Sequence, residues 1–440
     1  MKYLVLFAAP VAFSLLVLAL LVTHFHYEFD SFRLLIGHFS LRQAIALGHY
    51  HGCANPDNFP PFQHLTAAAM IAAGAKTGLA IVRGWAITSF VSIVALAILA
   101  FTTARKLAGR ASAWLAMLVI FSGPVIYYGS SSFNEVPAAL VTLAFTATVL
   151  CRGPVWQTAI LFLIAGMTKE VAAPFLLLIW ASRWIKQRPR AGEIAAMILA
   201  TLATFAATAA LNELRFGTFY NAENIKPFRI VSSLGQQAKY FAALWCSPSG
   251  GLVFFWPMFV VLLLACARAL ARKDGAIMWI VLLILLGLMT GLSRWHAPFG
   301  WDCWGPRLLV PWVPSLTAMM LSAYPRDALR WVPRSRAGII FAAIILVFFA
   351  LPHVIAIDHG PEVLREFNPV PVMPEDSARY YPHQNYLMWH ETPMLWMALR
   401  YATDPVNMLA AILELAAIIG VLTNSATREI PAAKNIPTGS

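Results

Sequence analysis

The chain has 440 residues, of which 60% are hydrophobic and only 12% are charged, and its formal net charge is +12 at pH 7. Soluble domains carry about 25% charged residues, so this composition excludes a soluble enzyme, a disordered protein and a fibrous repeat. Long apolar runs that lack the alternation of a membrane barrel predict an all-α polytopic membrane protein.

About twelve transmembrane helices are expected along the chain. Several candidate spans are shorter than the usual length of about 20 residues, so tilted helices or kinked pairs are expected among them. An even number of spans puts both termini on the same side of the membrane. In chain order the expected spans are 3–23, 84–104, 111–128, 136–151, 154–168, 171–185, 191–211, 251–267, 276–293, 308–323, 337–356 and 407–423.

The basic residues gather in the short loops on the side of the N terminus. Cytoplasmic loops of membrane proteins carry an excess of Lys and Arg, so both termini are expected in the cytoplasm. This asymmetry accounts for the positive charge without a nucleic-acid partner. Residues 1–22 are interpreted as a retained first span, because no small-x-small cleavage site precedes the aromatic stretch His24–Phe29.

The first outer loop begins with two carboxylates, Glu28 and Asp30, directly after the first span. On a helix these two side chains point to different faces. Apolar residues at helical spacing over 29–47 predict an amphipathic helix in the membrane interface. A break rich in Gly, Asn, Asp and Pro follows at 49–61, and a second interfacial helix is expected at about 63–81.

Polar motifs recur at the outer ends of later spans. They are Phe121–Pro124, Phe133–Pro137, Gly166–Glu170, Leu214–Thr218, Cys246–Leu252 and Gly300–Leu309. An ionisable residue at the edge of a span is costly, and it is retained either as an ion pair or for function. The ionisable residues concerned, for which both interpretations stay open, are Glu135, Lys169, Glu170, Arg294, Asp302 and Arg307.

Together these features resemble the membrane glycosyltransferases of the GT-C fold, a class that includes the protein O-mannosyltransferases and the lipid A aminoarabinose transferase. The resemblance includes the Pro-containing stretch Asn58–Leu65, and Gly300–Leu309 is similar to the W-G-x-x-x-W-G-P-R-x-L pattern of bacterial members. It covers about two thirds of the chain. It implies a GT-C transmembrane catalytic domain over 1–356, an outer segment with the last helix over 357–425, and a disordered cytoplasmic tail over 426–440.

The resemblance also implies roles for particular residues. Asp30 is the first candidate for the general base and Glu28 the second. Arg307 follows Gly305-Pro306 and is expected to open a helix, where a guanidinium suits a phosphate, although pairing with Asp302 is the alternative. Lys169 and Arg294 are the other candidates for donor-phosphate binding. Candidates for binding the rest of the substrate are Glu135, Glu170, His296, Trp301, Asp302 and Trp304. The two tryptophans lie either in the aromatic belt at the membrane interface or in a platform on which a sugar stacks.

The expected reaction transfers a sugar from a polyprenyl-phosphate donor, with inversion, to a hydroxyl group of a lipid, a glycan or a protein. The chain contains neither GxGxxG nor a P-loop, which agrees with a lipid-linked donor rather than a nucleotide sugar. No cofactor is expected, and a divalent metal is not required once cations neutralise the leaving phosphate. The expected location is the bacterial inner membrane, with the site on its outer face.

Two alternatives remain at this stage. A glycan polymerase or ligase has a similar number of spans and long outer loops, but lacks a carboxylate directly after the first span. A secondary transporter or lipid flippase would show broken mid-membrane helices with buried charges, whereas here the mid-span charge is essentially Glu414. Three cysteines are expected on the outer side, where one disulfide is permitted: Cys53, Cys246 and Cys303.

Overall fold

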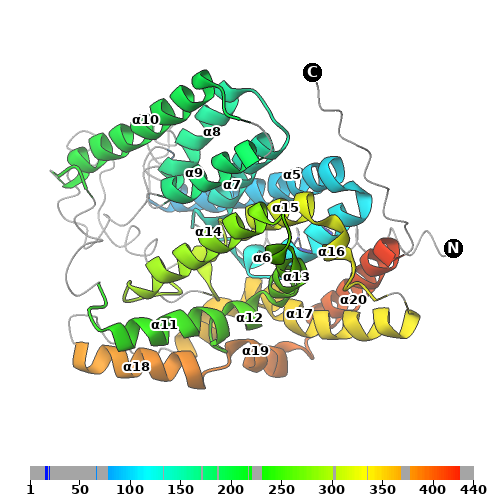
Figure 1. Ribbon diagram of the computed structural model, residues 1–440. Coiled ribbons are helices and arrows are strands. Elements are labelled where there is room, and N and C mark those ends of the chain that lie inside the picture. The colour runs from blue at the N-terminus through cyan, green and yellow to red at the C-terminus, as the bar shows by residue number, and fades with distance from the viewer. Residues whose placement is uncertain are drawn as a thin grey trace.

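A computed structural model describes most of the chain after residue 77 (Figure 1). The described residues are 15–17, 19, 66, 78–131, 133–169, 172–185, 188–216, 218–220, 230–300, 304–333, 335–367 and 377–426. Over these ranges the regular structure is helical, apart from an isolated bridge between Ile230 and Trp295.

The helices vary greatly in length. In chain order they are α5 (Gly78–Phe121), α6 (Val125–Tyr128), α7 (Glu135–Leu150), α8 (Val155–Thr168), α9 (Ala173–Ala181), η2 (Ser182–Ile185), α10 (Ala191–Phe216), α11 (Leu234–Cys246), α12 (Leu252–Phe255), α13 (Pro257–Ala267), η4 (Arg268–Ala271), α14 (Ala276–Ser293), η5 (Arg307–Leu309), α15 (Val313–Ala323), α16 (Pro325–Leu329), α17 (Arg336–Phe367), α18 (Ser377–His390), α19 (Pro393–Tyr401) and α20 (Pro405–Ala426).

Within the described ranges, five helices are long and apolar enough to cross a membrane, and five shorter apolar helices accompany them. Every expected span after the first overlaps with one of these helices or with an arm of α5. Of the first span, only residues 15–17 and 19 are described, and they are helical. Most of the first outer loop, including Cys53 and the first interfacial helix, lies outside the described residues.

Two expected spans, 84–104 and 111–128, follow each other as two helical arms, together labelled α5, with a non-helical residue between them. The kink is at Gly109, where φ is 89° and ψ is 176°. Glycine adopts positive φ without the clash that a Cβ atom would cause, so it permits this bend. The second arm ends earlier than expected, at Phe121, because the turn at Ser122–Pro124 separates it from α6.

Two other spans begin differently from the prediction. The expected span 251–267 is divided at Trp256 (φ −144°, ψ 53°) into α12 and α13, with Pro257 in the first turn of α13. The expected span 308–323 becomes an α-helix only at Val313, after the 3-10 turn η5. In both regions proline and the local backbone conformation interrupt an apolar run that hydropathy alone treats as continuous.

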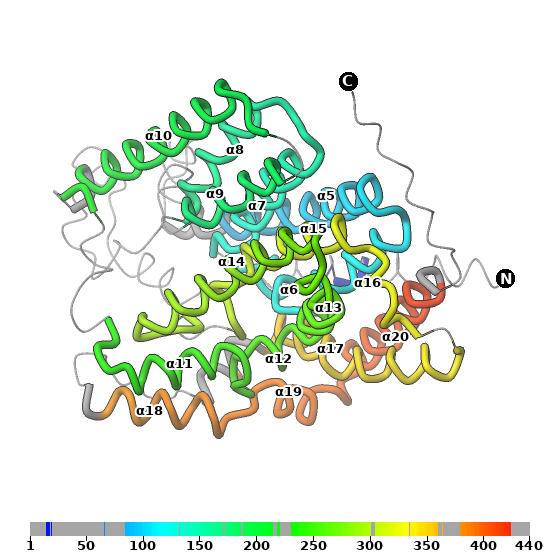
Figure 2. The backbone as a smooth tube through the Cα atoms, viewed as in Figure 1, coloured from blue at the N-terminus to red at the C-terminus, as the bar shows by residue number. Residues whose placement is uncertain are grey.

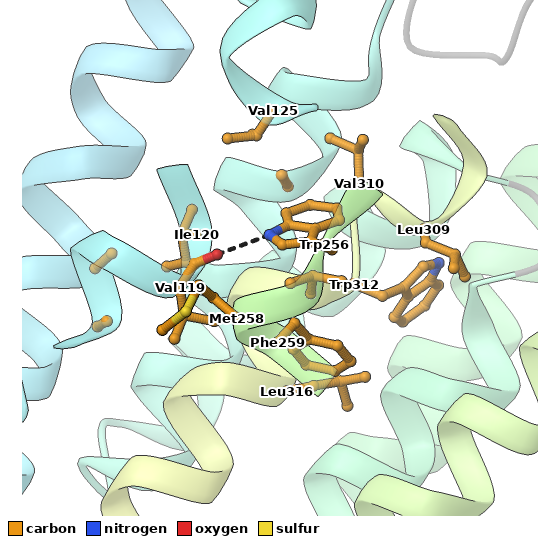
Figure 3. Close-up of a cluster of buried hydrophobic side chains, with 14 of the residues drawn as sticks. Val119, Ile120, Val125, Trp256, Met258, Phe259, Leu309, Val310, Trp312 and Leu316 are labelled. Atoms are coloured by element: carbon orange, nitrogen blue, oxygen red, sulfur yellow. Dashed lines mark hydrogen bonds between the residues drawn. The ribbon is translucent and has the colours of Figure 1, made fainter. Parts of the chain in front are cut away.

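The core is centred on α15, which is almost wholly buried and packs against α5, α7, α13 and α14 (Figures 1 and 2). Next to it, the indole Nε1 of Trp256 donates a hydrogen bond of 2.7 Å to the carbonyl oxygen of Val119 (Figure 3). This bond joins the break between α12 and α13 to the second arm of α5, and it satisfies a backbone group near the end of that arm.

The outward faces of the long helices are apolar. On α10 the exposed large side chains include Ile194, Ile198, Leu202 and Phe205, and on α17 they include Phe341, Ile344 and Phe348. These residues recur every three or four positions, so each set forms one stripe along its helix. Exposed apolar stripes of this length indicate contact with lipid, and they confirm an all-α polytopic membrane protein.

The C-terminal helices pack on the rest of the molecule. α17 continues to Phe367, beyond the span expected at 337–356. α20 packs against α17 and α5, and α19 against α17 (Figure 2). Of the described cysteines, Cys151, Cys246 and Cys266 are free thiols.

Candidate functional site

Three charged side chains from distant parts of the chain meet at the ends of α7, α8 and η5. The Nζ atom of Lys169 lies 2.8 Å from Oε1 of Glu135, and Nε of Arg307 lies 3.5 Å from the same oxygen. The exposed fractions of the three side chains are 2% for Glu135, 10% for Arg307 and 17% for Lys169. We call these three residues the ion cluster.

The ends of α7 and α8 are held together beside the ion cluster. Asn134 precedes Glu135, and its side-chain amide donates a 2.8 Å hydrogen bond to the carbonyl of Thr168. That bond places the first residue of α7 next to Lys169, which directly follows α8. Phe133 adds a cation–π contact, because Cζ of Arg307 lies 3.9 Å from the centre of its ring.

The loop that carries Arg307 is anchored by a chain of buried hydrogen bonds. The hydroxyl of Tyr128 donates to the carbonyl of Trp304 (2.8 Å), and the indole Nε1 of Trp304 donates to Nδ1 of His353 (2.8 Å). His353 Nε2 lies 3.0 Å from the carbonyl of Phe255, which requires that Nε2 carry the proton. Gly305 follows with φ of 66°, and a Cβ atom there would overlap the Phe255 ring.

Trp304 therefore differs from the prediction. Its side chain is fully buried among Tyr127, Phe255 and His353, so it belongs neither to an interface belt nor to an exposed stacking platform. An amphipathic indole is buried when its N–H finds a partner, and His353 supplies that partner. Trp304 acts instead as the anchor of the loop that holds Arg307.

The structural setting of Arg307 also differs from the prediction. It opens the 3-10 turn η5, and the α-helix α15 begins only at Val313. The argument from an α-helix N terminus therefore does not apply to Arg307. Its position is set by Glu135 and Phe133, and Asp302, the partner considered from the sequence, lies outside the described residues.

Electrostatics favour an anion at this place. Burial lowers the pKa of the Lys169 ammonium, the Glu135 carboxylate raises it, and the Arg307 guanidinium lowers it again. Two cations share one carboxylate here, and both are in or near a low-dielectric environment. Such cations bind phosphate or carboxylate oxygens through charge-assisted hydrogen bonds.

Two further candidates lie elsewhere. Arg294 is exposed at the end of α14, and its carbonyl accepts a hydrogen bond of 2.8 Å from the backbone of Val231. His296 is buried, and its ring packs beside Trp295 and Tyr380, the latter on α18.

The remaining candidates lie outside the described residues, and they are Glu28, Asp30, Glu170, Trp301 and Asp302. Among the described residues, no group of three His, Cys, Asp or Glu side chains could hold a metal ion.

Sequence reasoning missed the supporting residues of the site. Phe133 and Asn134 belong to a motif that it selected, but only Glu135 was singled out from that motif. Tyr128 and His353 were not selected at all. A signal for His353 existed, since it is a polar residue within an apolar span and such residues usually have a buried partner.

The architecture is that of the GT-C fold. Solved structures of ArnT from Cupriavidus metallidurans share it. The structure bound to undecaprenyl phosphate matches with a TM-score of 0.51 at 13% identity, covering 95% of this chain and 77% of that chain. The apo structure matches with a TM-score of 0.50 at 14% identity, covering 94% and 76%.

No protein-family model matches the chain, and no curated protein matches it in sequence. The structural likeness confirms the GT-C fold expected from the motifs. At this level of identity it establishes the fold alone, because one fold supports different activities.

Proposed function

We propose that the protein is an integral membrane glycosyltransferase that moves a sugar from a polyprenyl-phosphate donor to a hydroxyl acceptor, on the outer face of a bacterial inner membrane. The observation that carries this proposal is the convergence of Lys169 and Arg307 on Glu135 in a chain of GT-C fold. The ArnT structure that shares the fold is bound to undecaprenyl phosphate, which supports a lipid phosphate as donor.

The ion cluster is suited to the phosphate of such a donor. Lys169 and Arg307 both lie within 3.5 Å of one carboxylate oxygen, so both can reach a single phosphate group. Glu135 keeps the two cations in this arrangement before the donor binds. As the sugar leaves, negative charge grows on the phosphate, and fixed cations in a desolvated site stabilise it. This stabilisation does not require a metal ion.

The acceptor hydroxyl enters from the aqueous side. Asp30 removes its proton while the oxygen attacks the anomeric carbon, and the bond from that carbon to the phosphate oxygen breaks. Polyprenyl phosphate leaves, and a single displacement inverts the anomeric configuration. Glu28 is the second candidate for the base. Lipid, glycan and protein acceptors all offer a suitable hydroxyl, and the remaining candidates at the outer surface bind the sugar or the acceptor.

The test is transfer by purified protein in nanodiscs, with radiolabelled polyprenyl-phosphate sugars and a membrane extract as acceptor. We expect labelled product from wild type, and a loss of about a hundredfold or more in Asp30→Asn, because general-base catalysis contributes at least that factor. Arg307→Lys keeps the charge but not the planar fork, and we expect its donor KM to rise about tenfold.

Glu28→Gln is the matched control for the base. Loss of activity in Glu28→Gln with full activity in Asp30→Asn would move the base to Glu28. A product of many sugar repeats would indicate a polymerase. No turnover with any donor, combined with saturable flux of a solute in proteoliposomes, would replace this proposal with a transporter.

A further inference from the structure

A buried carboxyl group lines an apolar cavity in the bundle, separate from the ion cluster. Glu414 lies on α20, in the middle of the last span, and its exposed fraction is 3%. The cavity has a volume of about 340 Å³ and lies between α5, α17 and α20. Its walls are largely aliphatic and include Ile93, Val94, Leu118, Ala350 and Ile418. None of the three residues of the ion cluster lines it.

Two polar atoms at this cavity lack partners. Within the described part of the chain, Oε2 of Glu414 accepts no hydrogen bond and Nε1 of Trp114 donates none, although both atoms are buried. Glu414 and Trp114 both line the cavity. A buried polar group without a partner costs free energy, and an ionisable residue inside a membrane span is usually retained for a ligand or a function.

The chemistry of these two groups restricts the ligand. A phosphate would bring negative charge into a cavity whose lining includes no Lys or Arg, and an ammonium group cannot accept a hydrogen bond from the Trp114 indole. A hydrocarbon would leave both groups unpaired. A hydroxyl group both donates and accepts, so its chemistry matches the carboxyl as well as the indole N–H. The apolar walls are suited to a hydrocarbon chain.

We propose that this cavity binds a neutral amphiphile of the membrane that carries a hydroxyl headgroup on a long hydrocarbon chain. The hydroxyl lies at Glu414 and Trp114, and the chain runs along the aliphatic walls. The volume of the cavity is within the range of about 300–1,000 Å³ that is usual for small-molecule sites. The site is separate from sugar transfer, so it stands whether or not the proposed activity is found.

Photoaffinity labelling tests the site. The full chain in nanodiscs is labelled with hexadecanol that carries a diazirine on its chain, and labelled peptides are identified by mass spectrometry. We expect labels in α5 and α20. Unlabelled hexadecanol should compete about fivefold better than hexadecyl methyl ether, because the ether cannot donate and one hydrogen bond is worth about that factor. Equal competition would overturn the proposal, because it would show that the hydroxyl group adds nothing to binding. Water would then be the partner of Glu414 and Trp114.

Variants separate the hydrogen bonds from the packing. Glu414→Leu and Trp114→Phe each remove one polar partner, and we expect each to weaken labelling about fivefold. Glu414→Gln keeps an acceptor oxygen and should retain labelling. Ile412→Leu on the same helix is the control, because Ile412 is exposed and does not line the cavity.

Size-exclusion chromatography shows which variants fold. If Glu414→Leu does not fold, Trp114→Phe decides the question. Unchanged labelling in the folded variants, or stronger competition by hexadecyl phosphate than by hexadecanol, would overturn the proposal.

Discussion

Glu135 joins two cations that lie far from it in the chain, and it does so with a side chain that is 2% exposed. A buried ion pair contributes little net stability relative to an apolar replacement, but removal of one partner leaves an uncompensated charge. In the proposed mechanism Glu135 is therefore a positioning residue, which acts on the donor through Lys169 and Arg307.

The change Glu135→Gln keeps the shape of the side chain and removes its charge. Lys169 and Arg307 then repel each other, and we expect a loss of stability of about 3–5 kcal/mol together with a higher donor KM. Thermal unfolding in detergent and donor titration measure the two effects.

The matched control is Glu193→Gln, because Glu193 is another largely buried glutamate, paired with Arg183 at 3.0 Å. It should lower stability and leave the donor KM unchanged. An unchanged donor KM in a folded Glu135→Gln variant would contradict the positioning role.

A second prediction at the residue scale concerns pH. Burial lowers the pKa of Lys169 below the ordinary lysine pKa of about 10.4. As the pH rises, its ammonium therefore loses its proton at a lower pH than an exposed lysine does. In the proposed mechanism, phosphate binding by the free enzyme needs the charged form of Lys169. The alkaline limb of kcat/KM should therefore lie below pH 10.4, since kcat/KM reports groups of the free enzyme.

Lys169→Arg supplies the comparison, because arginine stays protonated throughout this range. The alkaline limb should move to higher pH in this variant, even if its activity is lower. An alkaline limb at the same pH in both proteins would assign it to another group.

At the scale of elements, the break between α12 and α13 is stabilised by contacts with α5. Trp256 stands at the break, and its indole covers Gly123 as well as donating to Val119. A Cβ atom on residue 123 would overlap the ring of Trp256. A small residue is thus required where the end of α5 approaches the break, and the turn at Ser122–Pro124 depends on it.

Gly123→Ala should therefore destabilise the protein by about 1–3 kcal/mol, because the indole that it meets is fully buried and is held by its hydrogen bond to Val119. Thermal unfolding in detergent measures this loss. Gly291→Ala in α14 is the control, since nothing lies within 4 Å of the added Cβ, and alanine should be neutral or more stable by up to about 1 kcal/mol. Equal unfolding temperatures for the two variants would contradict the contact.

At the scale of the whole molecule, charge predicts sidedness. Ser233 at the start of α11 and Lys273 between η4 and α14 are both exposed, and the expected topology puts them on opposite faces of the membrane. In a background with the native cysteines replaced, Ser233→Cys should react with an impermeant maleimide in spheroplasts. Lys273→Cys should react only after lysis. The reverse pattern would invert the topology and move the ion cluster to the cytoplasmic face.

Much of the architecture could be predicted from sequence because membrane helices are long, apolar and locally determined. The span expected at 276–293 coincides with α14, and the span at 191–211 lies within α10 (Ala191–Phe216). The breaks were harder to predict. At Trp256 backbone conformation interrupts an apolar run, which hydropathy does not measure, whereas Gly109 lies in the basic stretch 105–110 between two expected spans.

The site was predictable only in part. Glu135, Lys169 and Arg307 were selected because each is a charge at the end of a span. Their mutual contacts were not predicted, and Trp304 was assigned to the surface although it is fully buried. Asp30, the proposed general base, lies outside the described residues, so its role stays a prediction.

By itself the sequence determined the class of molecule, a polytopic helical membrane protein with polar motifs at the ends of its spans. Bilayer thickness and the need to satisfy backbone hydrogen bonds leave few alternatives for such a composition. Only the tertiary structure decided which charges share a site. Lys169 and Glu135 are 34 residues apart, and Arg307 comes from much later in the chain. Contacts between such residues depend on how helices pack, and helix packing leaves no local pattern in the sequence.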